Sequence, residues 1–230
     1  PSIGYPSQFA PFKVYESYAV MHGLQGPDKV SNAEYKFYDA VIPSGFDLSE
    51  FDFRDWSEKK DYFFMCGRLV WSKGVDIAAQ VTAKLGKKLI LAGTTYGPQD
   101  SNLGDKWPDH VEYVGYADVE KRKKLMSEAM GLFCPTIYNE PFGYVAIEAM
   151  LSGTPVITVD WGAFTETVQH GVTGYRCKDF GSFVRAAEVV DKLDPQNCRD
   201  WAMQSFSDEV VHNKFDAWIQ KIIRKDFYYV

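Results

Sequence analysis

Apolar runs alternate with segments of helical periodicity along most of the chain after about residue 60. Each run is apolar at successive positions, as expected for a strand buried on both faces, so the pattern predicts a parallel sheet covered by helices on both sides. This is a doubly wound, Rossmann-like α/β fold. The predicted strands are residues 62–69 (YFFMCGRL), 87–94 (KKLILAGT), 111–116 (VEYVGY), 131–136 (GLFCPT), 154–160 (TPVITVD) and, more briefly, 173–177 (TGYRC). The predicted helices are residues 74–86, 118–129, 180–192 and 207–226, with a further one around Glu148.

Residues 1–57 have a different character, because they are rich in aromatic and turn-forming residues. They predict only a short helix at 12–22 and a strand at 39–47, and they do not form a self-contained unit. The helix around Glu148 has clearer limits. Pro141 suits its first turn, and Gly153 suits its C-terminal stop.

The composition indicates a globular protein: the chain has 230 residues, 46% hydrophobic and 24% charged. A net charge of −6 argues against a nucleic-acid surface, so any anion must be held by a local arrangement. No stretch resembles a signal peptide or a membrane span, and four cysteines without paired spacing predict a reduced, cytoplasmic protein. No cluster of metal ligands is evident, so neither a metal nor a cofactor is expected.

Candidate chemistry lies after the strands, because ligands of an open parallel sheet bind beyond the carboxyl ends of its strands. Arg68 and Lys73 follow the first of these strands (GRLVWSKG), and the PFG turn follows the fourth. An arginine fork and a lysine point charge suit a diphosphate. The start of the helix after Pro141 adds unpaired N–H groups at the positive end of the helix dipole. Together these residues predict an anion site.

Glu140 and Glu148 stand eight positions apart beside this predicted anion site. Like charges repel, so the carboxylates cannot serve the phosphates, whereas they can accept hydrogen bonds from hydroxyls. Two carboxylates flanking a phosphate site therefore suggest hydroxyl-rich rings on both sides of a diphosphate. A nucleotide sugar fits this description.

The same segments resemble the donor-binding domain of family 4 (group 1) retaining glycosyltransferases with the GT-B fold. The motifs follow in that family's order, and two glutamates with seven residues between them are its mark. The resemblance covers about residues 60–178, and the last helix is compatible with the family's closing helix. The matching segments are GRLVWSKG, EPFGYVAIE and AMLSGTPVITVDWGAFTETVQHGVTGYRC.

The resemblance implies roles for individual residues. Arg68 and Lys73 would bind the diphosphate and act in catalysis with Glu140, which would hold the donor sugar. Glu148 would hold the ribose hydroxyls. Glu166 matches a further family position, and by itself it suits the capping or solvation of a turn equally well. The donor-binding residues implied in this way are Gly67, Arg68, Lys73, Tyr116, Glu140, Phe142, Gly143, Tyr144, Val145 and Glu148. Phe142 to Val145 would contribute backbone to sugar and phosphate, and the segment Val114–Tyr116 would lie against the nucleotide base.

The resemblance also implies a division of the chain. Residues 1–57 would be a linker and remnant of an N-terminal acceptor domain, 58–206 the nucleotide-sugar-binding domain, and 207–230 the closing helix. The implied activity is transfer of a sugar, with retention, from a nucleotide diphosphate sugar to an unidentified acceptor. Because the acceptor side would lie in an N-terminal domain or a partner chain, this chain is expected to bind donor and to turn over slowly or not at all.

Two alternatives stay open from the sequence: a nucleotide-sugar-binding module without transfer activity, and a GT-B-like nucleotide-sugar epimerase. A phosphorylase relative is less favoured, because no lysine signature for pyridoxal phosphate is evident. Other residues receive structural interpretations. The histidines are scattered, and the charged run 118–128 predicts a solvated helix face. Trp71 suits either a shield over the donor site or the core.

Overall fold

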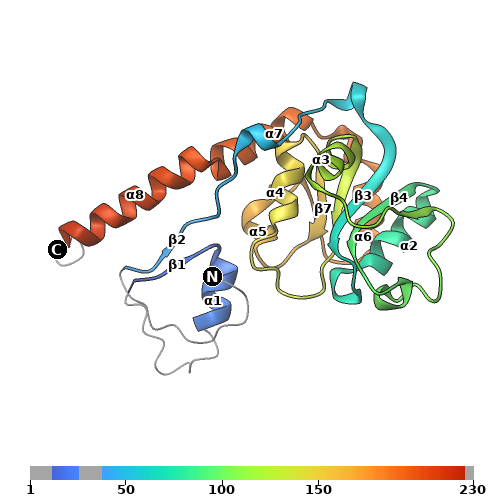
Figure 1. Ribbon diagram of the computed structural model, residues 1–230, viewed down its shortest axis with the longest axis horizontal. Coiled ribbons are helices and arrows are strands. Elements are labelled where there is room, and N and C mark those ends of the chain that lie inside the picture. Colours follow the sequence, from blue (N-terminus) through green and yellow to red (C-terminus); the bar gives the residue numbers. More distant parts are fainter. Residues whose placement is uncertain (1–11, 26–37, 226–230) are drawn as a thin grey trace.

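A six-stranded parallel sheet forms the centre of the protein (Figure 1), with the strand order β5-β4-β3-β6-β7-β8. The computed structural model describes residues 12–25 and 38–225. The strands of the sheet are β3 (Lys60–Arg68), β4 (Lys88–Thr94), β5 (Val111–Tyr113), β6 (Ala129–Cys134), β7 (Val156–Val159) and β8 (Gly174–Cys177). The sheet confirms the doubly wound α/β fold, and each apolar run predicted as a strand contributes one.

Helices cover both faces of this sheet. On one face α2 packs against α6, and on the other α4 packs against α7. The helices of this part are α2 (Val75–Leu85), α3 (Val119–Ser127), α4 (Tyr144–Leu151), α5 (Phe164–Thr167), α6 (Phe180–Glu188), α7 (Pro195–Phe206) and α8 (Asp208–Arg224). The core between the layers is built largely from fully buried aliphatic and phenylalanine side chains.

Aspartates set several helix starts. Asp118, Asp179 and Asp194 each accept a hydrogen bond from a backbone N–H in the first turn of α3, α6 and α7, respectively. Such caps satisfy amides that have no partner inside the helix. α7 was not among the helices predicted from the sequence, although Asp194 followed by Pro195 is a typical helix start.

Three predicted boundaries are wrong. The helix expected at 12–22 is a short strand, β1 (Val14–Tyr15), followed by α1 (Tyr18–Gln25), and the strand expected at 39–47 shrinks to β2 (Ala40–Val41). Pro141 lies outside α4 rather than in its first turn. The left-handed conformation of Gly143, with φ +84°, turns the chain after Pro141 and starts the helix. The stop at Gly153 is confirmed, since α4 ends at Leu151.

The N-terminal segment, residues 12–25, lies beside the sheet domain without joining its sheet. β1 pairs with β2 in a separate parallel pair. Figure 1 shows α8 running away from the domain towards these strands, where the Trp218 indole donates a 2.7 Å hydrogen bond to the Tyr38 carbonyl. The division of the chain into a linker (1–57), a nucleotide-sugar-binding domain (58–206) and a closing helix (207–230) stays a prediction.

None of the helices in the described ranges has the length and apolar character needed to cross a membrane, and the cytoplasmic location stays a prediction. All four cysteines are free thiols. Cys134, Cys177 and Cys198 are buried, and Cys66 is partly exposed.

The carboxyl ends of β3 and β4 approach closely where Gly67 pairs with Gly93. A Cβ on Gly93 would overlap the backbone carbonyl of Gly67, and Gly93 has φ +141°. Side chains rarely adopt such a conformation. This position therefore accepts only glycine, which leaves bare backbone at this edge of the sheet.

We expect Gly93→Ala to lower the free energy of unfolding by about 3 kcal/mol or more, because the methyl group adds overlap to an unfavourable φ. Gly86→Ala is a matched control, since Gly86 has φ +62° but its added Cβ meets nothing within 4 Å. That control should lose only about 1 kcal/mol. Urea denaturation measures both, and equal small losses would contradict the close approach of the two strands.

Candidate functional site

The carboxyl ends of the parallel strands meet at one edge of the sheet, which we call the rim (residues 67–73, 93–95, 114–117, 135–143 and 160–163). The strand order reverses there, because β3 neighbours β4 on one side and β6 on the other. Open α/β sheets bind ligands at such a reversal. Lys73 follows β3 and Glu140 follows β6, so these two residues flank it.

An ion pair joins these residues. Lys73 Nζ lies 2.9 Å from Glu140 Oε2, and the side chains are 24% and 12% exposed. The Tyr138 hydroxyl donates a 2.7 Å hydrogen bond to the same oxygen, and Lys73 Nζ lies 4.8 Å from the centre of the Tyr138 ring. Within the described part of the chain, no hydrogen bond engages Glu140 Oε1. One oxygen is thus fixed and the other is available to a ligand.

The lysine of this pair is held in its charged form. Burial opposes the charge, but the carboxylate of Glu140 and the hydrogen bonds with Tyr138 and Glu140 outweigh it, so the pKa of Lys73 is raised. A raised pKa keeps the amine protonated at neutral pH. The rim therefore presents a cation and a carboxylate side by side.

The start of α4 lies on the same rim. Its N-cap residue is Gly143, which has no side chain to cap the helix start, and no side chain of the described residues hydrogen-bonds to its first amides. A Cβ on Gly143 would lie 2.6 Å from Phe164 Cε1, so a larger residue does not fit without movement. Uncapped N–H groups at a helix start carry partial positive charge and favour anions.

A cavity of about 170 Å³ opens beside this helix start. Four of the predicted donor residues line it, namely Gly67, Tyr116, Val145 and Glu148. The remaining lining residues are Cys66, Ala92, Gly93, Thr94, Ala117 and Arg122. The cavity thus combines bare backbone from β3 and β4 with one carboxylate and one guanidinium.

Glu148 is an incompletely satisfied acceptor in this cavity. Its Oε2 is buried and accepts no hydrogen bond from the described residues, although Arg122 Nε lies 3.2 Å away. Burial raises the pKa of the Glu148 carboxyl, while the charge of Arg122 partly offsets this effect. Buried acceptors usually have a donor, so the site is suited to ligand hydroxyls.

The other predicted residues lie outside these two clusters. Arg68 is the exposed last residue of β3 and pairs with no carboxylate among the described residues. The Phe142 side chain is only 1% exposed and packs on Phe46, so only its backbone can meet a ligand. The Tyr144 hydroxyl instead donates a 2.7 Å hydrogen bond to Glu16 Oε1.

Tyr138 and Arg122 belong to these clusters but were not predicted from the sequence. Arg122 belongs to the charged run predicted to be a solvated face, and this prediction is wrong for Arg122, which lines the cavity. It stands one turn before the buried Met126, so helical spacing could have placed it towards the core. Tyr138 carried no comparable signal. Trp71 is 54% exposed, which excludes the core role.

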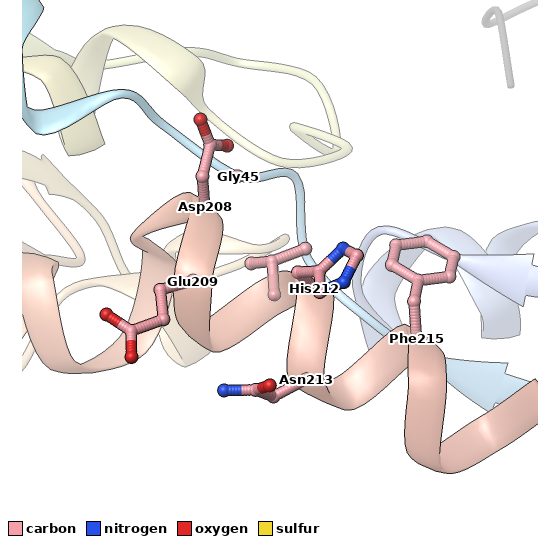
Figure 2. Close-up of a pocket in the computed structure, with 7 residues that line it drawn as sticks. Gly45, Asp208, Glu209, His212, Asn213 and Phe215 are labelled. Atoms are coloured by element: carbon pink, nitrogen blue, oxygen red, sulfur yellow. The ribbon is translucent and has the colours of Figure 1, made fainter.

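A larger cavity lies apart from the rim, between Gly45 and the first turns of α8 (Figure 2), with a volume of about 570 Å³. Figure 2 shows Asp208 and Glu209 projecting from the start of α8 in different directions. The described residues that line this cavity include no lysine or arginine, so they are unsuited to a diphosphate. Among the described residues, no three His, Cys, Asp or Glu side chains gather as metal ligands.

Known proteins resemble this chain in sequence and structure. It is similar to an uncharacterised glycosyltransferase of Methanocaldococcus jannaschii, with 31% identity over 156 residues covering 58% of this chain and 39% of the relative. It is also similar to a glycogen synthase of Mycobacterium tuberculosis, with 32% identity over 167 residues covering 67% of this chain and 39% of the relative. The chain therefore spans about two fifths of the length of these curated relatives.

Among solved structures, Anabaena Alr3699/HepE in complex with UDP-glucose superposes with a TM-score of 0.74 at 21% identity, covering 93% of this chain and 65% of that one. At this identity the likeness shows the fold. The family is shown by residues 49–201, which match the family described as "Glycosyl transferases group 1". The resemblance found in the sequence is therefore confirmed: the chain belongs to the group 1 glycosyl transferases, and its doubly wound sheet is the C-terminal domain of their GT-B fold.

Proposed function

We propose that the rim is the donor site of a retaining glycosyltransferase, which binds a nucleotide diphosphate sugar and passes its sugar to an acceptor. The observation that carries the proposal is the arrangement of Glu140, whose Oε2 is held by Lys73 and Tyr138 while Oε1 stays available. The names of similar proteins support it, since they include a glycogen synthase and a protein crystallised with UDP-glucose.

The diphosphate is assigned to Lys73, Arg68 and the start of α4. Lys73 is cationic and already desolvated, so it can bind a phosphate oxygen without a large further loss of hydration. Arg68 is unpaired within the described ranges and can reach a second oxygen through its fork. As the bond to the sugar breaks, negative charge grows on the leaving diphosphate, and these groups stabilise that charge. No metal is needed for this step.

The two carboxylates are assigned to hydroxyls at opposite ends of the donor. Glu140 Oε1 accepts from the donor sugar and holds its anomeric carbon for reaction. Glu148 accepts hydrogen bonds from the ribose hydroxyls inside the cavity, and Tyr116 lies against the nucleotide base. Glu140 thus binds the donor sugar, and Glu148 binds the ribose.

The acceptor side is assigned to an N-terminal domain or a partner chain. Two alternatives place the same donor in the same site: a binding module without transfer, and a nucleotide-sugar epimerase. Incubation of a bound nucleotide sugar with and without a panel of acceptors separates them. Transfer supports the proposal, an epimerised nucleotide sugar supports the epimerase, and a donor that stays unchanged even when an acceptor domain is supplied supports the module.

Thermal shift with UDP-, GDP- and ADP-sugars tests the donor class. A donor present at 100 times its dissociation constant should stabilise the chain by about 2.7 kcal/mol. Stabilisation by one nucleotide class supports the proposal and identifies the base. The absence of any shift with all three classes would contradict the donor site.

We expect Arg68→Ala and Lys73→Ala each to weaken binding of the selected nucleoside diphosphate by about 1–3 kcal/mol, the scale of a lost charge-assisted hydrogen bond. Isothermal titration calorimetry measures the affinity. Lys84→Ala is the control, because Lys84 is exposed near the end of α2, away from the rim. Unchanged affinity in both rim variants would remove the diphosphate assignment.

Because Glu148 is assigned to the ribose, we expect the loss of affinity on removal of the ribose hydroxyls to depend on Glu148. The wild type should bind the 2′,3′-dideoxy nucleotide about tenfold more weakly than the ribonucleotide, the scale of a lost charge-assisted hydrogen bond. Glu148→Gln should bind the two ligands more nearly alike. An undiminished preference in Glu148→Gln would place the ribose elsewhere.

The same carboxylate predicts a pH dependence. Only the ionised form of Glu148 accepts hydrogen bonds with both oxygens. Because burial raises the pKa of this carboxyl, acidification protonates it at a higher pH than an ordinary carboxyl. The affinity for the nucleotide should therefore begin to fall at that higher pH. Titration of the ligand phosphates affects wild type and Glu148→Gln equally, so the difference between their affinities isolates this effect. Parallel pH curves would contradict the role of Glu148.

A further inference from the structure

Glu166 is the one residue of the family pattern that the donor site leaves without a role. It lies in α5, and its carboxylate reaches the N-terminal segment. Glu166 Oε2 accepts a 2.8 Å hydrogen bond from the N–H of Tyr18, and Oε1 accepts a 2.9 Å hydrogen bond from the N–H of Ala19. These are the first two amides of α1, and they lie 148 and 147 positions away along the chain.

The first three amides of α1 all have acceptors in this arrangement. Ser17 precedes the helix, its hydroxyl oxygen accepts from the N–H of Val20 at 3.0 Å, and its carbonyl accepts from the N–H of Met21 at 3.0 Å. A helix begins with four N–H groups that lack partners inside it, and a carboxylate favours this end. Because Glu166 satisfies two of them, the positive end of α1 is occupied by protein and is not an anion site.

The capped helix start is attached to the loop that carries Glu140. The Ser17 hydroxyl donates a 2.5 Å hydrogen bond to the carbonyl of Pro141, and Ser17 is 1% exposed. A Cβ on Gly23 of α1 would lie 3.7 Å from Asn139 Nδ2. Residues on both sides of Glu140 therefore meet α1.

Glu166 is also tied to this loop through its own helix. The N–H of Ala163, at the start of α5, donates a 2.9 Å hydrogen bond to the carbonyl of Glu140. A Cβ on Gly162 would lie 2.8 Å from the backbone nitrogen of Glu140, so the two segments are in close contact. α5 and α1 thus hold the Glu140 loop between them, and Glu166 joins α5 to α1.

We infer that Glu166 is a positioning residue that seats α1 on the rim and thereby fixes Glu140 for the donor sugar. This role rests on the proposed function, although the seating itself does not. Glu166 does not contact the diphosphate in this arrangement, because its two oxygens face backbone N–H groups of α1.

Hydrogen exchange measured by NMR tests the seating without any ligand. In Glu166→Ala the amides of Tyr18 and Ala19 should exchange about tenfold faster than in the wild type, because their acceptor is gone. Glu166→Gln keeps one carbonyl oxygen and should protect only one of the two. Glu188→Ala removes an equal charge from the exposed end of α6 and should leave both amides protected. Unchanged exchange in Glu166→Ala would overturn the inference.

Isothermal titration calorimetry with UDP-glucose, used as the probe with ADP-glucose and GDP-mannose in parallel, tests the effect on Glu140. Glu166→Ala should weaken the affinity for the nucleotide sugar by about tenfold while the affinity for the matching nucleoside diphosphate stays within about twofold, because only the sugar end of the site is disturbed. Ser17→Ala should act in the same direction, and the double variant should lose less than the sum of the two.

Two outcomes would overturn this role: an unchanged affinity for the nucleotide sugar in Glu166→Ala, or a loss of nucleoside diphosphate affinity as large as in Lys73→Ala. If the wild type binds none of the three nucleoside diphosphates, the proposed function fails instead. The exchange rates of Tyr18 and Ala19 then still decide whether Glu166 seats α1.

Discussion

The parallel arrangement of the six strands, with its reversal between β3 and β6, is the constraint on which the rest of the structure depends. Parallel strands end at a common edge, so residues far apart in sequence meet there. The reversal separates the loops after β3 and β6 and leaves room between them. Lys73 and Glu140 come from these two loops and meet at 2.9 Å. The site follows from the topology before any side chain is considered.

Electrostatics then decides what this site can hold. The chain carries a net charge of −6, so its overall field does not attract an anionic donor. The local arrangement favours an anion, because the pKa of Lys73 is raised and the Gly143 N-cap offers no side chain to the start of α4. Glu140 is paired with Lys73 at 2.9 Å, but its Oε1 accepts no hydrogen bond from the described residues, and the buried Glu148 Oε2 likewise accepts none. The division between phosphate-binding and hydroxyl-binding groups is the basis of the proposed donor site.

Much of the fold could be predicted from the sequence, because buried parallel strands are apolar throughout and stand out between helical segments. The order of motifs also placed the chain in its family. Helix starts were harder to predict. Pro141 suggested an early start for α4, but the left-handed Gly143 delays it to Tyr144, and only the backbone conformation reveals this. Short elements such as β1 depend on pairing partners that local sequence does not show.

The candidate site was predictable where a motif fixes both residue and position, as for Lys73, Glu140 and Glu148. It was not predictable where a role depends on contacts across the chain. Tyr138 shares an oxygen of Glu140 with Lys73, and Glu166 binds amides near residue 18; neither contact leaves a periodic signal. Arg122 was hidden in a charged run, although its spacing from Met126 marks the inner face of α3.

The sharpest test of the proposed donor site is a crystal structure of the chain with a bound nucleotide sugar, chosen from the donor class that stabilises the chain. We expect the diphosphate between Lys73 and the start of α4, a sugar hydroxyl on Glu140 and the ribose on Glu148. A nucleotide bound away from the rim, or one bound there with its phosphates facing the carboxylates, would rule out this site.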